Sequence, residues 1–169
     1  MPLVETPRLE LRRLTEDDAP FVLVLLNEPS FIRNIGDRGV RTLDDARAYI
    51  ANGPVASYAR QGFGLYLVER REPRAPIGIC GLLKREVLPE PDIGFAFLPA
   101  YWSQGYGLES ATAVRDYARD TLGLARLLAI VSPANDSSIR LLEKLGFAFS
   151  SLTILATDAP AVKLYTCDL

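Results

Sequence analysis

The sequence contains no histidine, and this absence removes several kinds of catalytic site. Without an imidazole the chain can form neither a Ser-His-Asp triad nor a Cys-His pair, and most zinc sites also use a histidine ligand. The two cysteines, Cys80 and Cys167, are too far apart in sequence to suggest a metal cluster or a disulfide framework. We therefore expect no bound metal, and acid–base chemistry that uses carboxylates, hydroxyls, tyrosine, lysine or water.

Long apolar runs and basic blocks are missing as well. No apolar stretch is long enough to span a bilayer, and the N-terminal residues lack the apolar core of a signal peptide. The basic residues (19) are balanced by the acidic ones (21), so that no excess of positive charge favours a nucleic acid. We therefore expect a cytoplasmic protein with neither a membrane nor a nucleic acid as a partner.

The patterning that is present predicts one mixed domain over residues 1–169. A chain of this length, 49% hydrophobic, can bury a substantial core. Apolar periodicity and turn residues predict the element order β-α-α-β-β-β-α-β-α-β-β. Strands are expected at 8–14, 62–70, 75–86, 91–99, 125–132, 147–155 and 161–169, and helices at 15–28, 42–53, 107–122 and 135–145. The three central strands predict an antiparallel meander, and the following β-α-β unit predicts a parallel crossover. The fold class is therefore α/β (α+β) with a mixed sheet.

The stretch YWSQGYGLES, residues 101–110, places two glycines at the start of the third predicted helix. Glycine in a helix interior costs roughly 0.5–1 kcal/mol relative to alanine. At a helix start, however, it lets the main chain approach an anion that the free N–H groups can bind. The stretch is not a P-loop, because no Lys-Ser/Thr follows, and a GxGxxG pattern is broken at Ser110. From these residues alone, a tight turn without a ligand is an equally good interpretation.

A second stretch adds to the first. Together, YWSQGYGLES and SPANDSSIRLLEKLGF, residues 132–147, resemble the GNAT acyl-CoA-dependent N-acetyltransferases. ETPRLELRRLTEDD, residues 5–18, is typical of their RimJ/RimL-like branch. The resemblance implies a mostly antiparallel seven-stranded sheet with about four helices and a V-shaped splay between the fourth and fifth strands. It also implies acetyl-CoA as co-substrate and a primary amine as acceptor, either a protein N-terminus or a small molecule. Monomer and homodimer both stay open.

The resemblance also assigns cofactor contacts to the glycine turn. In the family, a turn of the form Arg/Gln-x-x-Gly-x-Gly/Ala holds the coenzyme A pyrophosphate with its backbone N–H groups. Gly105 and Gly107 match the small positions, and Trp102 stands at the Arg/Gln position. The backbone expected to face phosphate is that of Gln104, Gly105, Tyr106, Gly107, Leu108 and Glu109.

The strand before the turn has a second implied role. Phe97 and Leu98 are expected to pair with the acyl-pantetheine arm through their backbone, and the Phe97 amide is expected to polarise the thioester carbonyl. The alternative is that both are simply core or edge residues.

Candidate proton-transfer residues also follow from the resemblance. In many relatives a tyrosine at the position of Leu142 protonates the departing thiolate. The resemblance to the RimJ/RimL-like branch implies that Ser138 has this role here, and Ser137 is the second candidate. Asn135 is implied as a ligand of the pantetheine or the acceptor. Alternatively, Asn135 is only a helix N-cap and Ser138 a small packing residue.

A carboxylate is the natural base in a chain without histidine, acting directly or through water. Asp92 stands where relatives often have glutamate, and it is the first candidate for the base. Glu90 is the second candidate. The alternative is that both are solvated turn residues, as acids at strand starts commonly are. Arg33, Arg38 and Arg41 are alternative binders of an acidic acceptor group.

Two other functions stay open. A catalytically weak acyl-CoA-binding module is suggested by Leu142 at the tyrosine position. A nucleotide-binding protein could use the same glycine turn, although the sequence shows no pocket for a base.

Overall fold

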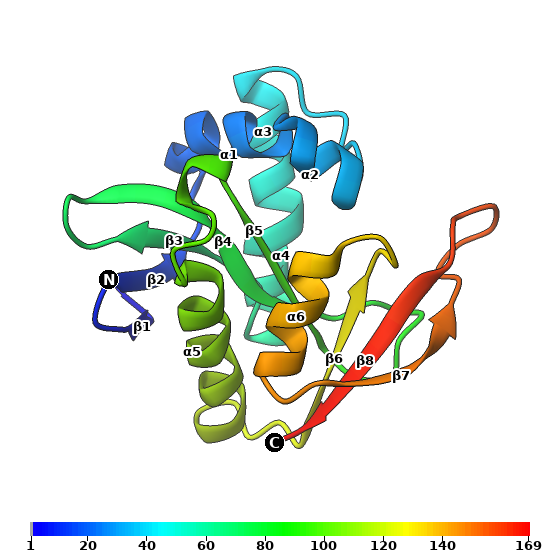
Figure 1. Cartoon of the computed structure of the whole chain (residues 1–169). Helices are drawn as coiled ribbons and strands as arrows, with labels where there is room; N and C mark the ends of the chain where they lie inside the picture. Colours follow the sequence, from blue (N-terminus) through cyan, green and yellow to red (C-terminus); the bar gives the residue numbers. More distant parts are fainter. Residues whose placement is uncertain (1) are drawn as a thin grey trace.

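The computed structural model describes residues 2–169, whose strands form one eight-stranded sheet in the order β1-β2-β3-β4-β5-β6-β8-β7 (Figure 1). The strands are β1 (Val4–Glu5), β2 (Leu9–Arg13), β3 (Leu65–Arg70), β4 (Ala75–Leu83), β5 (Asp92–Phe97), β6 (Arg126–Val131), β7 (Ala148–Thr153) and β8 (Val162–Asp168). Neighbouring strands are antiparallel except β5 and β6. The predicted meander, the parallel crossover and the mixed, mostly antiparallel sheet are confirmed. The eighth strand, which the sequence did not predict, is the two-residue β1.

The parallel pair β5 and β6 separates almost at once. The two strands share one paired position, Asp92 with Leu128, and the N–H of Leu128 donates to the carbonyl of Pro91 at 2.9 Å. Beyond this point β5 pairs only with β4, and β6 pairs only with β8. The facing edges of β5 and β6 therefore carry no ladder over most of their length. This is the V-shaped splay that the resemblance implied.

Helices cover both faces of the sheet (Figure 1). They are α1 (Ala19–Leu26), α2 (Pro29–Asn34), α3 (Leu43–Ile50), α4 (Ala56–Gln61), α5 (Tyr106–Asp120) and α6 (Asp136–Lys144). On one face, α5 and α6 pack on a core cluster that includes Tyr66 and Ile93. On the other, α1 and α3 pack on a cluster that includes Leu67 and Ile79. Successive residues of a strand point to opposite faces, which is why adjacent Tyr66 and Leu67 belong to different clusters.

The first helical region differs from the prediction. The helix expected over 15–28 begins as a 3-10 turn at Glu16–Asp18 and becomes α1, and α2 follows between the first two predicted helices, where no element was predicted. The helix expected to end at Gly53 instead continues from α3 through a π turn at Ala51–Val55 into α4, which ends at Gly62. Pro54 has no N–H to donate, and the wider π turn lets the helix pass this buried proline.

The start of α5 lies close to the middle of α6 and to the end of β5. A Cβ built on Gly107 would lie 2.8 Å from Cδ1 of Leu141 and 3.8 Å from Cε2 of Phe97. Gly107 therefore allows the first turn of α5 to approach both α6 and the end of β5 closely. The two sequence stretches that suggested a common function are thus brought together in space.

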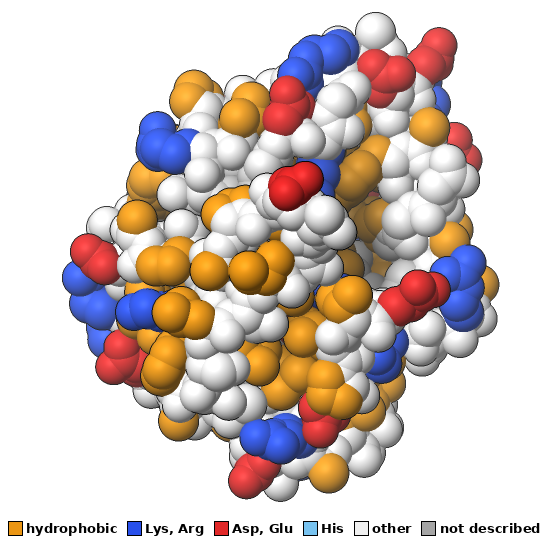
Figure 2. All heavy atoms as spheres, turned by 90° about the vertical axis from the view of Figure 1, so that its right-hand side faces the viewer, with side chains coloured by type: hydrophobic (Ala, Val, Ile, Leu, Met, Phe, Trp, Pro, Cys, Tyr) orange, Lys and Arg blue, Asp and Glu red, His pale blue; other side chains and the backbone are white. Residues whose placement is uncertain are grey.

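The edge of the sheet at β7 is exposed. Figure 2 shows hydrophobic side chains on the face that includes this edge, where Phe149, Leu152 and Ile154 are 54%, 61% and 64% exposed. Among residues 2–169, no helix combines the length and the apolar character needed to cross a membrane.

Candidate functional site

The glycine turn presents a run of unpaired backbone donors. Within residues 2–169, no backbone N–H from Ser103 to Leu108 donates to an acceptor. The first such bond of α5 runs from the N–H of Glu109 to the carbonyl of Gly105, at 3.0 Å. Ser103 and Gly105 both have left-handed φ values, 60° and 83°, a feature of backbone nests that bind anions. The positive end of the helix dipole adds to this attraction, so the turn can hold a phosphate group.

The edge of β5 that faces the V also carries free donors. The N–H of Leu98 donates to Ile77 on β4 at 3.0 Å, which fixes the alternation along the strand. The N–H groups of Phe95 and Phe97 therefore point away from β4 and toward the V. The carbonyl of Phe97 accepts a 2.9 Å hydrogen bond from the Trp102 indole. Trp102 thus joins the turn to the end of this strand.

Leu98 does not share this orientation. Its N–H is bonded to β4, and its carbonyl accepts from the N–H of Tyr101 at 2.9 Å. The N–H of Leu98 is therefore not available to donate to an acyl-pantetheine arm, in contrast to the N–H of Phe97.

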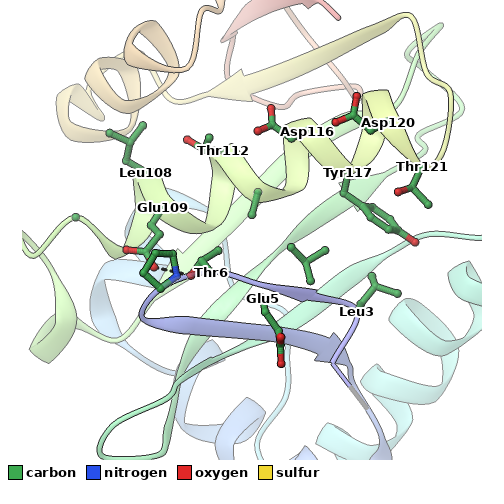
Figure 3. Close-up of a pocket in the computed structure, with 14 residues that line it drawn as sticks. Leu3, Glu5, Thr6, Leu108, Glu109, Thr112, Asp116, Tyr117, Asp120 and Thr121 are labelled. Carbon is green, nitrogen blue, oxygen red and sulfur yellow. Dashed lines mark hydrogen bonds between the residues drawn. The ribbon is translucent and has the colours of Figure 1, made fainter.

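Glu109 also differs from the expectation, since its N–H is already bonded within the helix. Its carboxylate points from α5 to the segment between β1 and β2 (Figure 3). One oxygen accepts from the Thr6 hydroxyl at 2.5 Å and from the N–H of Arg8 at 3.1 Å, and the other accepts from Nε of Arg8 at 2.7 Å. Partial burial opposes ionisation, but the hydrogen bonds from Thr6 and Arg8 hold the pKa of Glu109 below its ordinary value. Glu109 therefore offers no free backbone donor to an anion.

The start of α6 combines a helix cap with free donors. The side-chain oxygen of Asn135 accepts from the N–H of Ser138 and from the hydroxyl of Ser137, each at 3.3 Å. Asn135 is therefore an N-cap. Its amide NH₂ and the half-buried hydroxyl of Ser138 donate to no acceptor among residues 2–169. Both groups remain available to a ligand near the V. Leu142, by contrast, is 1% exposed and belongs to the core.

Asp92 lies at the closed end of the V and is 1% exposed. Burial raises the pKa of Asp92 to about 6, although Arg85 opposes the shift from 3.2 and 3.3 Å. The side chain shares its face of the sheet with Leu98, on the side of α1 and α3. Asp92 and Ser138 are therefore on opposite faces. Glu90 is half-buried in the turn before β5.

The predicted arginines lie near α2 and α3. Arg41 is held by Asp37 at 2.5 Å and by the side-chain oxygen of Asn27 at 3.0 Å. Arg33 and Arg38 are exposed, and neither forms an ion pair within the described residues. Of the three, these two have guanidinium groups without a carboxylate partner.

A cavity of about 710 Å³ lies between β1 and α5 (Figure 3). It is lined by residues such as Leu3, Thr6, Leu108, Thr112 and Tyr117, and none of its lining residues belongs to β5 or β6. It is therefore distinct from the V. No group of three or more Cys, Asp or Glu side chains within residues 2–169 is arranged to hold a metal ion.

Sequence reasoning missed three residues around the site. Arg8 and Thr6 contact the start of α5 across about a hundred residues of chain, and Arg85 covers Asp92. Arg8 and Thr6 belong to ETPRLELRR, a stretch that suggested a family and no role.

Known proteins resemble this chain in sequence and in fold. A family model described as an acetyltransferase (GNAT) domain matches residues 8–148. The uncharacterized N-acetyltransferase YoaA of Bacillus subtilis is 29% identical over 147 residues, covering 86% of this chain and 82% of YoaA. The crystal structure of an acetyltransferase from Agrobacterium tumefaciens is 27% identical with a TM-score of 0.82, covering 99% of this chain and 94% of that one. RimL, a ribosomal alpha-N-protein acetyltransferase in complex with coenzyme A, has a TM-score of 0.84 at 18% identity, covering 100% and 98%. The likeness to RimL is one of fold.

Proposed function

Because the chain belongs to the GNAT family of acetyltransferases, and is thus an acyltransferase, we propose that it transfers the acetyl group of acetyl-CoA to a primary amine. One observation carries the proposal. The run of free N–H groups from Ser103 to Leu108 lies next to the free N–H groups of Phe95 and Phe97. Donors for a pyrophosphate therefore adjoin donors for an acyl-pantetheine arm, which are the two parts of an acyl-CoA.

The V would hold the reacting thioester. The pantetheine arm pairs with the free edge of β5, and the N–H of Phe97 donates to the thioester carbonyl oxygen. A neutral amine attacks the carbonyl carbon, and the Phe97 N–H stabilises the negative charge that develops on oxygen. The intermediate collapses with cleavage of the carbon–sulfur bond, and the coenzyme A thiolate leaves.

Proton transfer would use the two faces of the sheet. Asp92 removes a proton from the amine on the side of α1 and α3, and because its carboxylate is buried beneath Arg85 it acts through water. On the side of α6, Ser138 donates its hydroxyl proton to the thiolate and takes up a proton from water in the same step. A thiol pKa near 8.5 makes the thiolate an acceptable leaving group, so the acid contributes less than the oxyanion donor.

Amines that are partly unprotonated at neutral pH are the best candidates for the acceptor. An α-amino group has a pKa near 7.7–8.0, whereas a lysine ε-amine has a pKa near 10.4 and depends more on a base. Protein N-termini are therefore our first candidates, and small-molecule amines are the second. Arg33 and Arg38 would bind an acidic group of the acceptor, because both lack a carboxylate partner among the described residues.

We also propose that residues 1–169 form a single acyltransferase domain. The family model ends at residue 148, but β8 lies between β6 and β7 in the sheet order. The residues beyond the match therefore complete the same sheet.

Calorimetric titration with coenzyme A and acetyl-CoA tests the proposal, followed by a panel of peptides and polyamines in which release of the coenzyme A thiol is measured. We expect micromolar binding and transfer to at least one amine. Binding without transfer would instead favour an acyl-CoA-binding module, for which the burial of Leu142 is the structural argument. If ATP or NAD binds as tightly as coenzyme A, the turn is a nucleotide site and the proposal fails.

A further inference from the structure

We infer that Arg8 is a further ligand of the coenzyme A pyrophosphate, supplied from outside the glycine turn; the inference rests on the proposed function. The turn itself brings no cationic side chain. Residues 99–108 read PAYWSQGYGL and contain neither lysine nor arginine. A pyrophosphate held there by backbone donors alone would lack a charged partner.

Arg8 brings its guanidinium to this turn. Its Nη1 donates to the carbonyl of Gln104 at 2.9 Å, and its Cζ lies 4.3 Å from the centre of the Tyr106 ring. A Cβ built on Gly105 would lie 3.2 Å from its Nη2. The guanidinium therefore touches successive residues of the turn whose N–H groups are free.

Part of the Arg8 side chain remains available to a ligand. Nε and Nη1 are bonded, but Nη2 donates to no acceptor among residues 2–169. The side chain is 44% exposed, so an incoming phosphate oxygen can reach it. Hydrogen bonds between arginine and phosphate are charge-assisted and stronger than those from neutral backbone donors.

Glu109 and Thr6 position this guanidinium. The Glu109 carboxylate binds both Nε and the backbone N–H of Arg8. The Thr6 hydroxyl donates to that carboxylate and holds it in place, as Figure 3 shows. With Nε directed at Glu109, the fork of Nη1 and Nη2 is directed at the turn. This gives a role to the stretch ETPRLELRR and to the Glu109 carboxylate.

The experiment compares a donor that has phosphates with one that lacks them. In Arg8→Gln we expect the dissociation constant of coenzyme A to rise roughly tenfold or more, as loss of one charged hydrogen bond predicts. The specificity constant kcat/KM should fall similarly with acetyl-CoA but change less than twofold with S-acetylpantetheine, which carries no phosphate. Arg13→Gln is the matched control, because Arg13 also stacks on a tyrosine, with Cζ 5.0 Å from the Tyr58 ring, and its side chain forms no hydrogen bond with the turn within residues 2–169.

An equal loss with both donors would show that Arg8 only braces the turn, and no loss with either would also overturn the inference. If Arg8→Gln does not fold, Arg8→Lys serves in its place. It keeps the charge but loses the fork, and we expect a several-fold loss with acetyl-CoA alone. If the wild-type chain itself does not bind coenzyme A, the proposed function is refuted. This result can be told apart from the outcomes above, which all concern the Arg8 variants.

Discussion

Asp92 is the residue whose protonation should control the rate. Burial raises its pKa to about 6, so the carboxylate is ionised at neutral pH and becomes protonated as the pH falls through 6. Below pH 7 the acceptor amine is largely protonated as well. A plot of log kcat/KM against pH should therefore have a slope near 2 below pH 6 and a slope near 1 between pH 6 and pH 7. Asp92→Asn should keep a slope near 1 throughout and lose roughly a hundredfold in kcat/KM at pH 7.

The thermal melt of Asp92→Asn is the control, because Arg85 loses a charged partner in that variant. A slope change near pH 6 that persists in Asp92→Asn would assign the titration to another group, and Asp92 would then have a structural role.

Ser138 is the residue that should act on the leaving group. Its hydroxyl has no acceptor among the described residues, and it lies one turn before Leu141, which contacts the start of α5. Ser138→Ala should lower kcat about tenfold, at the weak end of general-acid effects because a thiolate leaves readily, with little change in the KM for acetyl-CoA.

Ser138→Thr retains a hydroxyl and should recover most of the rate, whereas the exposed Ser150 provides an alanine control on β7. If Ser138→Ala and Ser150→Ala have equal turnover, Ser138 is a packing residue only.

Two predicted residues, Leu98 and Glu109, show where sequence reasoning stops. Period-two alternation identified the strand, but the N–H of Leu98 faces β4 because of a register that depends on Ile77, about twenty residues earlier. Glu109 was assigned from its place in the turn, and its carboxylate is held by residues near the N-terminus. Contacts between segments distant in the chain leave no local pattern. Asn135 was predictable as an N-cap because capping is local.

At the scale of the element, the start of α5 can be tested with a matched pair of glycines. Gly105 and Gly123 flank the helix, and both have left-handed φ values, 83° and 68°. Gly105→Glu and Gly123→Glu should each cost roughly 1–2 kcal/mol of unfolding free energy in urea, since a side chain is strained in this conformation. Only the carboxylate at 105 would repel a pyrophosphate, so only that variant should weaken coenzyme A binding, by at least tenfold. Comparable losses of binding in both would attribute the effect to destabilisation of the helix.

The strand β5 makes a second prediction that depends on its alternation. The N–H groups of Phe95 and Phe97 face the V, whereas that of Leu98 is bonded to β4. Hydrogen exchange measured by NMR should therefore show that acetyl-CoA protects the amides of Phe95 and Phe97, with little change at Ala96 and Leu98. Uniform protection along the strand would indicate general stabilisation and contradict direct pairing with the pantetheine arm.

Element types were more predictable than their ends. The strands and the helices on the α5 and α6 face follow from hydrophobic periodicity and clear caps, and their predicted ranges contain or nearly match the observed ones. The region from Ala51 to Gly62 departs from prediction because a π turn carries the helix past Gly53 and Pro54. Burial of Pro54 and of neighbouring helix residues decides that outcome, and the local sequence does not display it.

At the scale of the whole molecule, the sheet is almost divided in two between β5 and β6, and we call this division the seam. Its two sides share one paired position, and much of what joins them is the packing of α5 and α6 on a common core. Nη1 of Arg115 on α5 also donates to the carbonyl of Leu145, just after α6, at 2.7 Å. A ligand in the V would contact both sides of this seam, so its binding should stabilise the fold as a whole.

Thermal unfolding tests this linkage. A ligand at a hundred times its dissociation constant adds about 2.7 kcal/mol to the free energy of unfolding. For a chain of this length, each kcal/mol raises Tm by roughly 2–4 °C, so coenzyme A should raise Tm by about 5–10 °C. At the same concentration Gly105→Glu, whose dissociation constant we expect to be at least tenfold higher, should gain no more than about 1.4 kcal/mol and shift Tm by no more than about 3–6 °C. A shift below about 1 °C in the wild-type chain, with binding saturated by calorimetry, would mean that coenzyme A binds the unfolded chain equally well, and the V would not be its site.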